Sequence, residues 1–345
     1  VRYTAAGIID TTFGNWGIVI QDMGTNLAYC VGAAMQGEKI IAAGQILNEP
    51  NSTNPKYYNF GAARYNSNGT IDDTFGIDEN PANLTTVNVT ANSNDRCYAT
   101  AVQDDGKVLL AGGTEGGAKF TIVRLSSDGV VDTDFGTGGI VQQAIFEKAW
   151  INSIVVQPDK KIVAAGAAEK DGRRYIALAR FEENGGLDTS FGSGGIITTP
   201  VGTTGNAAAK DVILQGDKII VAGWTNCNGN EDFVLIRYDS NGIPDDTFGT
   251  DGMVITDRGI NKQNVLNAAA LLPDGRIIGA GYSSNGTYKQ FTVVCYTADG
   301  KLDTTFGGNG NGAPNGFVIP FAGESVAEAV AVRNGKIFAG GSIKM

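Results

Sequence analysis

The sequence contains no histidine among its 345 residues. This absence excludes Ser-His-Asp and Cys-His catalysis, metals held by imidazole, and a histidine pH switch. Cysteine is scarce and forms no Cys-x-x-Cys pair, so a cysteine-held metal cluster is not expected. Two disulfides would fit the even number, but scattered cysteines in a chain of this length favour buried free thiols. The four are Cys30, Cys97, Cys227 and Cys295.

Charged residues and long apolar runs are also in short supply. Only 18% of the residues are charged, and 36 acidic against 26 basic side chains give a net charge of -10. This acidic balance disfavours nucleic-acid backbones and anionic lipid as partners. No segment approaches the roughly 18 consecutive apolar residues of a membrane-spanning helix, so membrane insertion is not expected. The chain starts with Val1 rather than Met, which is typical of a processed or trimmed product.

Glycine is plentiful, with 49 residues, and much of it belongs to an internal repeat. A Phe-Gly pair recurs six times at intervals of 56 to 62 residues. An Asp stands three residues before each Phe, and a Gly six residues before it, usually after Asp or Asn. Asx-Gly pairs tolerate the positive φ of a tight turn, so this segment predicts a turn in each repeat. The six markers are Phe13, Phe75, Phe135, Phe191, Phe248 and Phe306.

Each repeat also predicts four short β-strands. An apolar, β-branched run that ends in an Ala-Gly pair, such as 39–44, is typical of a strand. Another strand precedes it through a tight turn such as 103–106, a third follows as in 120–124, and a fourth comes after Phe-Gly as in 139–143. The second residues of the six Ala-Gly pairs are Gly44, Gly112, Gly166, Gly223, Gly281 and Gly340.

Four short strands every ~58 residues, without helical periodicity, predict a six-bladed β-propeller of four-stranded antiparallel blades. We expect residues 1–345 to form this single domain. The chain opens near the end of a third strand, at Val1–Tyr3, and closes with a second strand, at 336–340. We therefore expect the last blade to be closed by both termini, which hides two open edges.

The repeats resemble a known family. The run Arg237-Tyr-Asp-Ser-Asn-Gly-Ile-Pro-Asp-Asp-Thr-Phe248-Gly, with Leu187-Asp-Thr-Ser-Phe191-Gly and Gln157-Pro-Asp159, is similar to the bacterial delta-60 repeat. The resemblance spans essentially the whole chain. It implies a propeller-like domain, usually in large secreted or surface proteins, some of which are cargo for type IX secretion and carry a sorting domain that is not present in this sequence. It implies no general catalytic activity. The chain departs from the pattern at Cys295, where the other five repeats have Arg.

The recurring charged residues favour a structural interpretation. An Arg stands eight residues before the conserved Asp in five repeats, as at Arg64 and Asp72, so we expect an Arg-Asp staple within each repeat. A functional residue need occur only once, whereas these recur with the fold. Function is expected where the repeats differ, in the loops between second and third strands and between successive repeats. These variable loops are 45–59, 76–96, 202–206, 225–232 and 283–289.

Aromatic residues at that variable end are the candidate binding residues. They would rim the central opening and bind a sugar or an extended peptide, with gap-filling between blades as the alternative. The candidates are Trp150, Trp224, Tyr282, Tyr29 and Tyr98. The expected function is that of a non-catalytic binding or structural module, located outside the cell or on its surface. Its expected partner is a protein or a glycan, and other domains of a larger surface protein are one kind of protein partner.

The alternative is a calcium-dependent, lactonase-like hydrolase with carboxylates at the channel mouth. Such a site works without histidine, but the sequence contains no recognised calcium loop. We therefore predict no catalytic residue, no metal ligand and no cofactor. Only the hydrolase alternative would use a cofactor, Ca²⁺. Its carboxylates would be Asp211, Glu231, Asp232 or Glu328.

Overall fold

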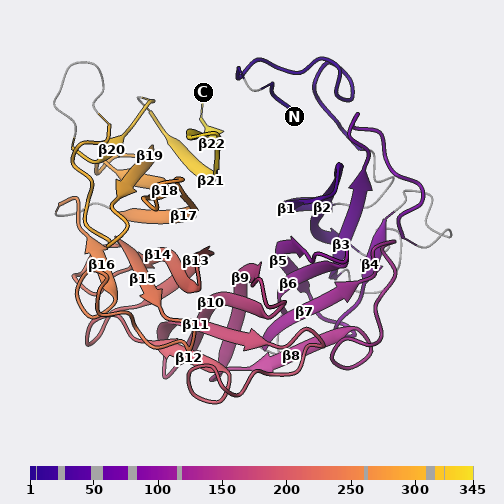
Figure 1. Ribbon diagram of the computed structural model, residues 1–345, viewed down its shortest axis with the longest axis horizontal. Coiled ribbons are helices and arrows are strands. Elements are labelled where there is room, and N and C mark those ends of the chain that lie inside the picture. Colours follow the sequence, from indigo (N-terminus) through magenta and orange to yellow (C-terminus); the bar gives the residue numbers. More distant parts are fainter. Residues whose placement is uncertain are drawn as a thin grey trace. The chain divides into compact units, whose positions relative to one another are not determined.

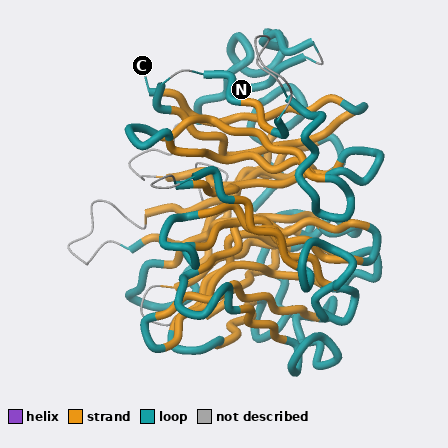
Figure 2. Tube along the Cα trace, turned by 90° about the vertical axis from the view of Figure 1, so that its left-hand side faces the viewer, coloured by secondary structure: helices purple, strands orange, loops and turns teal. Residues whose placement is uncertain are grey.

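The computed structural model describes residues 1–4, 6–21, 28–47, 57–76, 84–114, 119–259, 263–307, 315–321 and 323–344. These residues form strands and loops and no helix (Figure 2). Accordingly, this part of the chain has no helix of the length and apolar character needed to cross a bilayer. The all-β expectation, with four antiparallel strands per repeat, is confirmed in five sheets.

The chain divides into two compact units. Figure 1 labels the strands of both. Unit 1 comprises residues 1–162 and 182–186, and unit 2 comprises residues 163–181 and 187–345. The boundary passes through one sheet, with strand order β12-β11-β10-β9. Its strands are β9 (Lys148–Val156), β10 (Ile162–Lys170), β11 (Arg173–Phe181) and β12 (Ile196–Thr199).

Unit 1 contains two further sheets whose strands are paired in chain order. They comprise β1 (Ala28–Gln36), β2 (Lys39–Leu47), β3 (Tyr58–Tyr65), β4 (Thr85–Val87), β5 (Asp95–Val102), β6 (Val108–Thr114), β7 (Lys119–Leu125) and β8 (Ile140–Ala144). The two sheets pack through a cluster of buried apolar side chains. Large side chains such as Phe60, Phe75 and Leu110 fill the space beside small ones such as Ala43 and Ala62.

Unit 2 repeats this arrangement. It comprises β13 (Ala207–Gln215), β14 (Lys218–Thr225), β15 (Asp232–Tyr238), β16 (Met253–Thr256), β17 (Asn264–Leu271), β18 (Ile277–Ser284), β19 (Lys289–Tyr296) and β20 (Phe317–Val318). A two-stranded sheet of β21 (Ser325–Arg333) and β22 (Lys336–Ile343) follows. The first strands β13, β17 and β21 are neighbours, which brings equivalent positions of successive repeats side by side.

The first strand of five sheets carries a β-bulge at the same place. The marker glycine of the second strand lies opposite, and a Cβ on Gly281 would lie 1.9 Å from the carbonyl oxygen of Val265. Only glycine fits so close to a backbone oxygen, so the recurring Ala-Gly pair is the partner of the bulge. The residues that the bulge leaves outside the pairing are Val31, Tyr98, Lys210, Asn267 and Glu328.

This geometry corrects one assignment made from the sequence. A Cβ on Gly341 would lie 1.9 Å from the carbonyl oxygen of Val326, whereas one on Gly340 would meet open space. The glycine opposite the bulge is therefore Gly341, and the assignment of Gly340 was wrong by one residue. The reason is that Gly340 replaces the alanine that precedes the marker glycine in the other repeats.

The expected closure by the two termini is not formed in the strand pairing. The sheet of β21 and β22 has two strands, and the described N-terminal residues form isolated bridges, Tyr3 with Ile9 and Asn15 with Ile18. Within unit 1 the N-terminal segment instead contacts the first sheet, where the Gly14 amide donates to the carbonyl oxygen of Asn68 at 2.7 Å. Residues 1–21 and β22 belong to different units.

Candidate functional site

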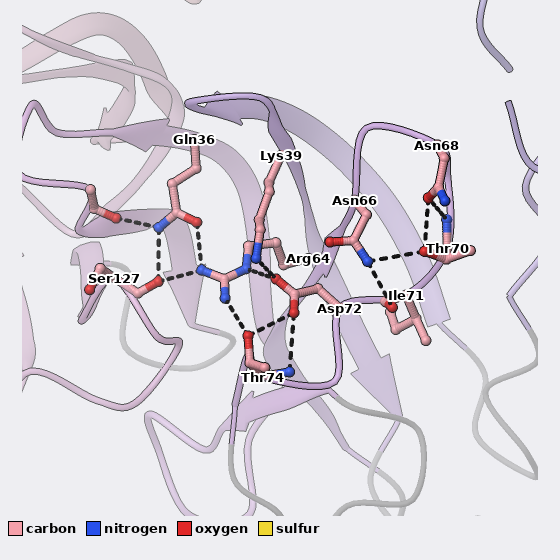
Figure 3. A network of polar contacts seen from close by, with 11 residues as sticks. Gln36, Lys39, Arg64, Asn66, Asn68, Thr70, Ile71, Asp72, Thr74 and Ser127 are labelled. Atoms are coloured by element: carbon pink, nitrogen blue, oxygen red, sulfur yellow. Dashed lines mark hydrogen bonds and ion pairs between the residues drawn. The ribbon is translucent and has the colours of Figure 1, made fainter.

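The turn that follows the third strand of the first sheet, β3, holds a network of charged groups (Figure 3). The Arg64 Nε donates to the Asp72 Oδ2 at 2.5 Å, and the Lys39 ammonium donates to the same oxygen. The other carboxylate oxygen accepts the backbone amide and the hydroxyl of Thr74. Burial raises the pKa of Asp72, but these donors outweigh it and hold that pKa well below its ordinary value.

The predicted Arg-Asp staple is confirmed in five repeats. The Nε–Oδ2 distances lie between 2.5 and 2.9 Å. The pairs are Arg2–Asp10, Arg64–Asp72, Arg124–Asp132, Arg180–Asp188 and Arg237–Asp245. Each guanidinium also lies over the Phe ring of its Phe-Gly marker, at 4.4 to 4.8 Å from the ring centre.

The same arginines reach the next repeat, which the sequence analysis did not predict. The Arg64 Nη1 donates to the carbonyl oxygen of Ser127 at 2.7 Å, and the Arg237 Nη1 to that of Ala298 at 2.6 Å. The staple therefore joins successive sheets as well as closing its own turn. Its recurrence and its complete pairing identify it as structural.

Position 295 lacks the staple. The Cys295 side chain is buried, and the carboxylate of Asp303 is paired with Arg276 Nη1 at 3.0 Å instead. Hydrogen bonds from Thr305 and Arg276 lower the pKa of Asp303 to about 2. None of the four cysteines forms a disulfide: Cys97 and Cys295 are buried, Cys227 is partly buried and Cys30 is exposed.

At the other end of the unit 2 sheets, cations cover two of the predicted aromatic residues. The Arg174 guanidinium lies 5.9 Å from the ring centre of Trp224, and the Lys289 ammonium 4.1 Å from that of Tyr282. Trp224 is partly exposed, whereas Tyr282 is buried. Both aromatic residues stand directly after the marker glycine, at the end of a second strand.

Lys210 lies among these groups. It occupies the bulge of β13, and its charge interacts with those of Glu328, Arg174, Glu231 and Lys289. Burial, together with the like charges of Arg174 and Lys289, lowers the pKa of Lys210, and the two carboxylates oppose that change. We call Lys210, Glu231, Lys289, Glu328 and the bulge residue Asn267 the Lys210 cluster. Every member belongs to unit 2.

The two carboxylates of the cluster are engaged by neutral groups. The Glu328 Oε2 accepts a hydrogen bond from Asn267 Nδ2 at 3.2 Å, which links the bulges of β21 and β17. Glu231 lies beside the Tyr282 hydroxyl. Burial raises the pKa of Tyr282 to about 12, with Glu231 and Glu328 acting in the same direction, so this phenol stays protonated at neutral pH and is not a base.

The remaining predicted carboxylates do not join the cluster. The Asp211 carboxylate accepts the backbone amides of Val212 and Ala269. Asp232 is 1% exposed, and one of its oxygens, Oδ1, has no hydrogen-bond partner. Burial raises the pKa of Asp232, as does the nearby Asp257. Within the described part of the chain, no three acidic or cysteine side chains are grouped so that they could hold a metal ion.

The predicted aromatic residues of unit 1 lie on three different strands, β1, β5 and β9. Tyr29 is 51% exposed and packs edge-to-face against Tyr58, with ring centres 5.9 Å apart. Trp150 packs over Gly113 of the preceding sheet, because a Cβ added to Gly113 would lie only 3.0 Å from the Cβ of Trp150. Tyr98 occupies the bulge of β5. For Trp150 the geometry matches the gap-filling alternative.

The sequence analysis missed Lys210, Asn267, Arg174 and Lys289. A usable signal was present at the first two. Five first strands have one position where the residue differs from repeat to repeat while its neighbours, Asp211 excepted, are small or apolar. That position is the bulge, but a bulge changes the pairing register without changing the repeat spacing.

Comparison with known proteins places this geometry in a family. Residues 39–75, 103–135, 157–191, 215–248 and 272–306 match the family described as "Domain of unknown function (DUF5122) beta-propeller", and together they make up just over half of the chain. No curated protein sequence matches the chain.

Several solved structures are similar to this chain. A PL25 ulvan lyase is 12% identical with a TM-score of 0.50, over 92% of this chain and 81% of the lyase. The same kind of lyase bound to -[GlcA(1-4)Rha3S]- gives 12% identity and a TM-score of 0.50, over 93% and 81%. The α-L-arabinofuranosidase Arb93A from Fusarium graminearum is 10% identical with a TM-score of 0.43, over 60% of this chain and 64% of the enzyme, so the chain spans less than two thirds of that enzyme.

At such identities these likenesses concern the fold alone. The five family matches coincide with repeats that carry the marker glycine, the Asp of the turn and the Phe-Gly pair, and four of them also carry the Arg of the staple. The chain therefore belongs to the DUF5122 β-propeller family.

Proposed function

We propose that this chain is a non-catalytic, glycan-binding module of a secreted or cell-surface protein. The observation that carries the proposal is the Lys210 cluster. Strands β13, β17 and β21, with the start of β19 and the loop before β15, bring two carboxylates, an amide and two ammonium groups together beside aromatic rings. Such a combination is typical of sugar sites, where aromatic faces and convergent polar groups fix a hydroxylated ligand. The delta-60 resemblance supports the extracellular location.

We also propose that the module closes as a six-bladed ring, with one blade shared between the termini. The structural elements present at each end of the chain support this closure. Residues 1–21 contain the Arg2–Asp10 staple and Phe13, which elsewhere follow a third strand. The sheet of β21 and β22 has first and second strands and no third. Joined, the two pieces have the complement of a full sheet and leave no open strand edge.

A cysteine cross-link tests the closure. In the first sheet Ile40 pairs with Tyr65, and the equivalent residues at the two ends are Ile337 and Tyr3. The closed ring predicts that the double variant Tyr3→Cys, Ile337→Cys forms an intramolecular disulfide, mapped by mass spectrometry under non-reducing conditions. The off-register control Tyr3→Cys, Ser342→Cys should not cross-link. Equal cross-linking in both variants, or in neither, contradicts the closure.

Glycan binding is tested on the complete chain with a panel of neutral and acidic polysaccharides, by affinity electrophoresis and calorimetry. We expect at least one class to bind, with binding weakened in the variant Glu328→Gln. Absence of binding to every glycan, together with capture of a defined protein partner, would replace the glycan by a protein ligand.

The hydrolase alternative has one supporting observation, the unpaired Oδ1 of the buried Asp232 beside Asp257. Two adjacent carboxylates are stabilised by a bound cation. Added Ca²⁺ should then raise the Tm of the wild type and not that of Asp232→Asn, and lactone hydrolysis should depend on the ion. A Tm that Ca²⁺ does not change removes this alternative.

A further inference from the structure

Two ammonium groups in the Lys210 cluster, those of Lys210 and Lys289, form no direct ion pair within the described part of the chain, although Glu328 and Glu231 lie near Lys210. Lys210 and Lys289 are both half-buried. Neither ammonium forms a hydrogen bond or an ion pair with any residue that the structure describes, although Lys289 lies over the Tyr282 ring. A charge that is partly removed from water and left unpaired costs free energy. The fold therefore keeps two cations in a state that a bound anion would stabilise.

The neighbouring carboxylates do not neutralise them directly. The Glu328 carboxylate accepts from the Asn267 amide, and that of Glu231 lies beside the Tyr282 hydroxyl. The third cation nearby, Arg174, is already held by Glu169, at 2.8 Å from Nη2 and 3.3 Å from Nε. Lys210 and Lys289 are thus the members of the group that remain available to an outside anion.

We infer that the Lys210 cluster binds an acidic sugar, whose carboxylate or sulfate group is bound by the ammonium groups of Lys210 and Lys289. This inference rests on the proposed glycan-binding function and names the class of glycan. The Glu328 carboxylate accepts one hydrogen bond from Asn267, and the Glu231 carboxylate lies beside the Tyr282 hydroxyl, so the remaining lone pairs of both suit sugar hydroxyls on the atoms next to the anion. The Asn267 amide nitrogen already donates to the Ala327 carbonyl oxygen and to Glu328, so its Oδ1 adds an acceptor on the strand between β13 and β21.

A ligand with one anionic group and several hydroxyls satisfies both halves of the cluster at once. The net charge of -10 repels an acidic polymer at long range, so local contacts must supply the affinity. Because these contacts are partly exposed, salt screens them, with a Debye length of about 8 Å at physiological ionic strength. Binding should weaken as the salt concentration rises.

The test uses the complete chain and three oligosaccharides of equal length: oligogalacturonate, a sulfated galactan fragment and the neutral galactan fragment. Calorimetry should show that at least one anionic oligosaccharide binds more tightly than the neutral one. Lys210→Gln and Lys289→Gln should each weaken that binding by about tenfold, the usual effect of losing one charge-assisted hydrogen bond. The two anionic probes distinguish carboxylate from sulfate as the recognised group.

The matched control is Lys301→Gln. Lys301 forms an ion pair with Asp299 at 2.8 Å in the turn after β19, so its loss should leave glycan binding unchanged. Lys210→Gln removes no partner, and its Tm should equal or exceed that of the wild type. If that variant does not fold, Lys289→Gln provides the same comparison.

The failures are distinguishable. Equal affinity for neutral and anionic oligosaccharides, or unchanged binding in both lysine variants, overturns the acidic-sugar inference and leaves glycan binding in place. Absence of binding to all three and to the polysaccharide panel overturns the proposed function as well.

Discussion

The two ends of the unit 2 sheets treat charge in opposite ways. At the staple end, Arg237 is buried and uses all its donor nitrogens, on Asp245, Gln215, Thr247 and the carbonyl oxygen of Ala298. At the variable end, the Lys210 ammonium has no such partner. The contrast separates roles: paired charge that recurs with the repeat holds the fold together, and unpaired charge that occurs once is available to a ligand.

The largest expected effect at the staple end is the loss of folding stability at low pH. The staple contacts lower the pKa values of Asp72, Asp132 and Asp245 from 3.8, and in the repeat without a staple Thr305 and Arg276 lower that of Asp303 to about 2. A carboxylate with a depressed pKa in the folded state stabilises the fold above its unfolded pKa, and this contribution is lost as the pH falls through the folded value.

We therefore expect stability to be nearly constant from pH 5 to 8, where no histidine titrates, and to collapse between about pH 4 and 2. Thermal unfolding followed by circular dichroism across this range measures it. A stability that declines steadily from neutral pH would contradict the assignment of the staple carboxylates.

Removing one staple partner should have the next largest effect. Arg237→Ala leaves the Asp245 carboxylate, 9% accessible, with only Lys218 as a cationic partner. Breaking a buried pair typically costs about 3–5 kcal/mol of unfolding free energy, which urea denaturation would detect. The control Lys301→Ala removes an exposed ion pair and should cost about 0–1 kcal/mol. Similar losses in the two variants would remove the distinction between the staple and ordinary surface charge.

The sequence predicted the staple end well and the variable end poorly, for a physical reason. Residues that recur, such as Arg64, Asp72 and Phe75, form a local motif whose spacing is set by one turn, so periodicity reveals it. The Lys210 cluster is assembled from residues that occur once and belong to different repeats. The bulge that presents Lys210 depends on strand register, which spacing does not encode. Two of the predicted aromatic residues, Trp224 and Tyr282, lie beside this cluster, and the other three do not take part in it.

The bulge itself can be tested with a pair of glycines. Gly281→Ala would place a Cβ 1.9 Å from the Val265 carbonyl oxygen, so the sheet must shift. Overpacking typically costs about 1–3 kcal/mol of unfolding free energy, and we expect a loss near the upper end of that range. We also expect weaker glycan binding, because Asn267 moves. Gly340→Ala meets open space and should be neutral or stabilising by up to about 1 kcal/mol. If both variants unfold at the same denaturant concentration, the marker glycine is not required by the bulge.

The smallest expected effect concerns the exception at position 295, where the staple end departs from its own pattern. In five repeats the arginine reaches a carbonyl oxygen in the turn of the next repeat. The turn that would follow the fifth sheet in a closed ring is the N-terminal one, in which the Gly7 amide donates to the Thr4 carbonyl oxygen. Cys295→Arg would supply the missing staple at that joint only if the ring closes.

Closure therefore predicts that Cys295→Arg raises the free energy of unfolding by about 1 kcal/mol, the net value of a further hydrogen bond, as measured by urea denaturation. In an open chain the introduced guanidinium would find Asp303 alone and would bury donors without acceptors, so the same variant would lower stability. Cys295→Ser serves as the control, because it adds a polar group too short to reach the turn and should destabilise in either case. The sign of the change in the free energy of unfolding of Cys295→Arg therefore distinguishes the two cases. An increase indicates a closed ring in which the guanidinium reaches the N-terminal turn, and a decrease indicates an open chain.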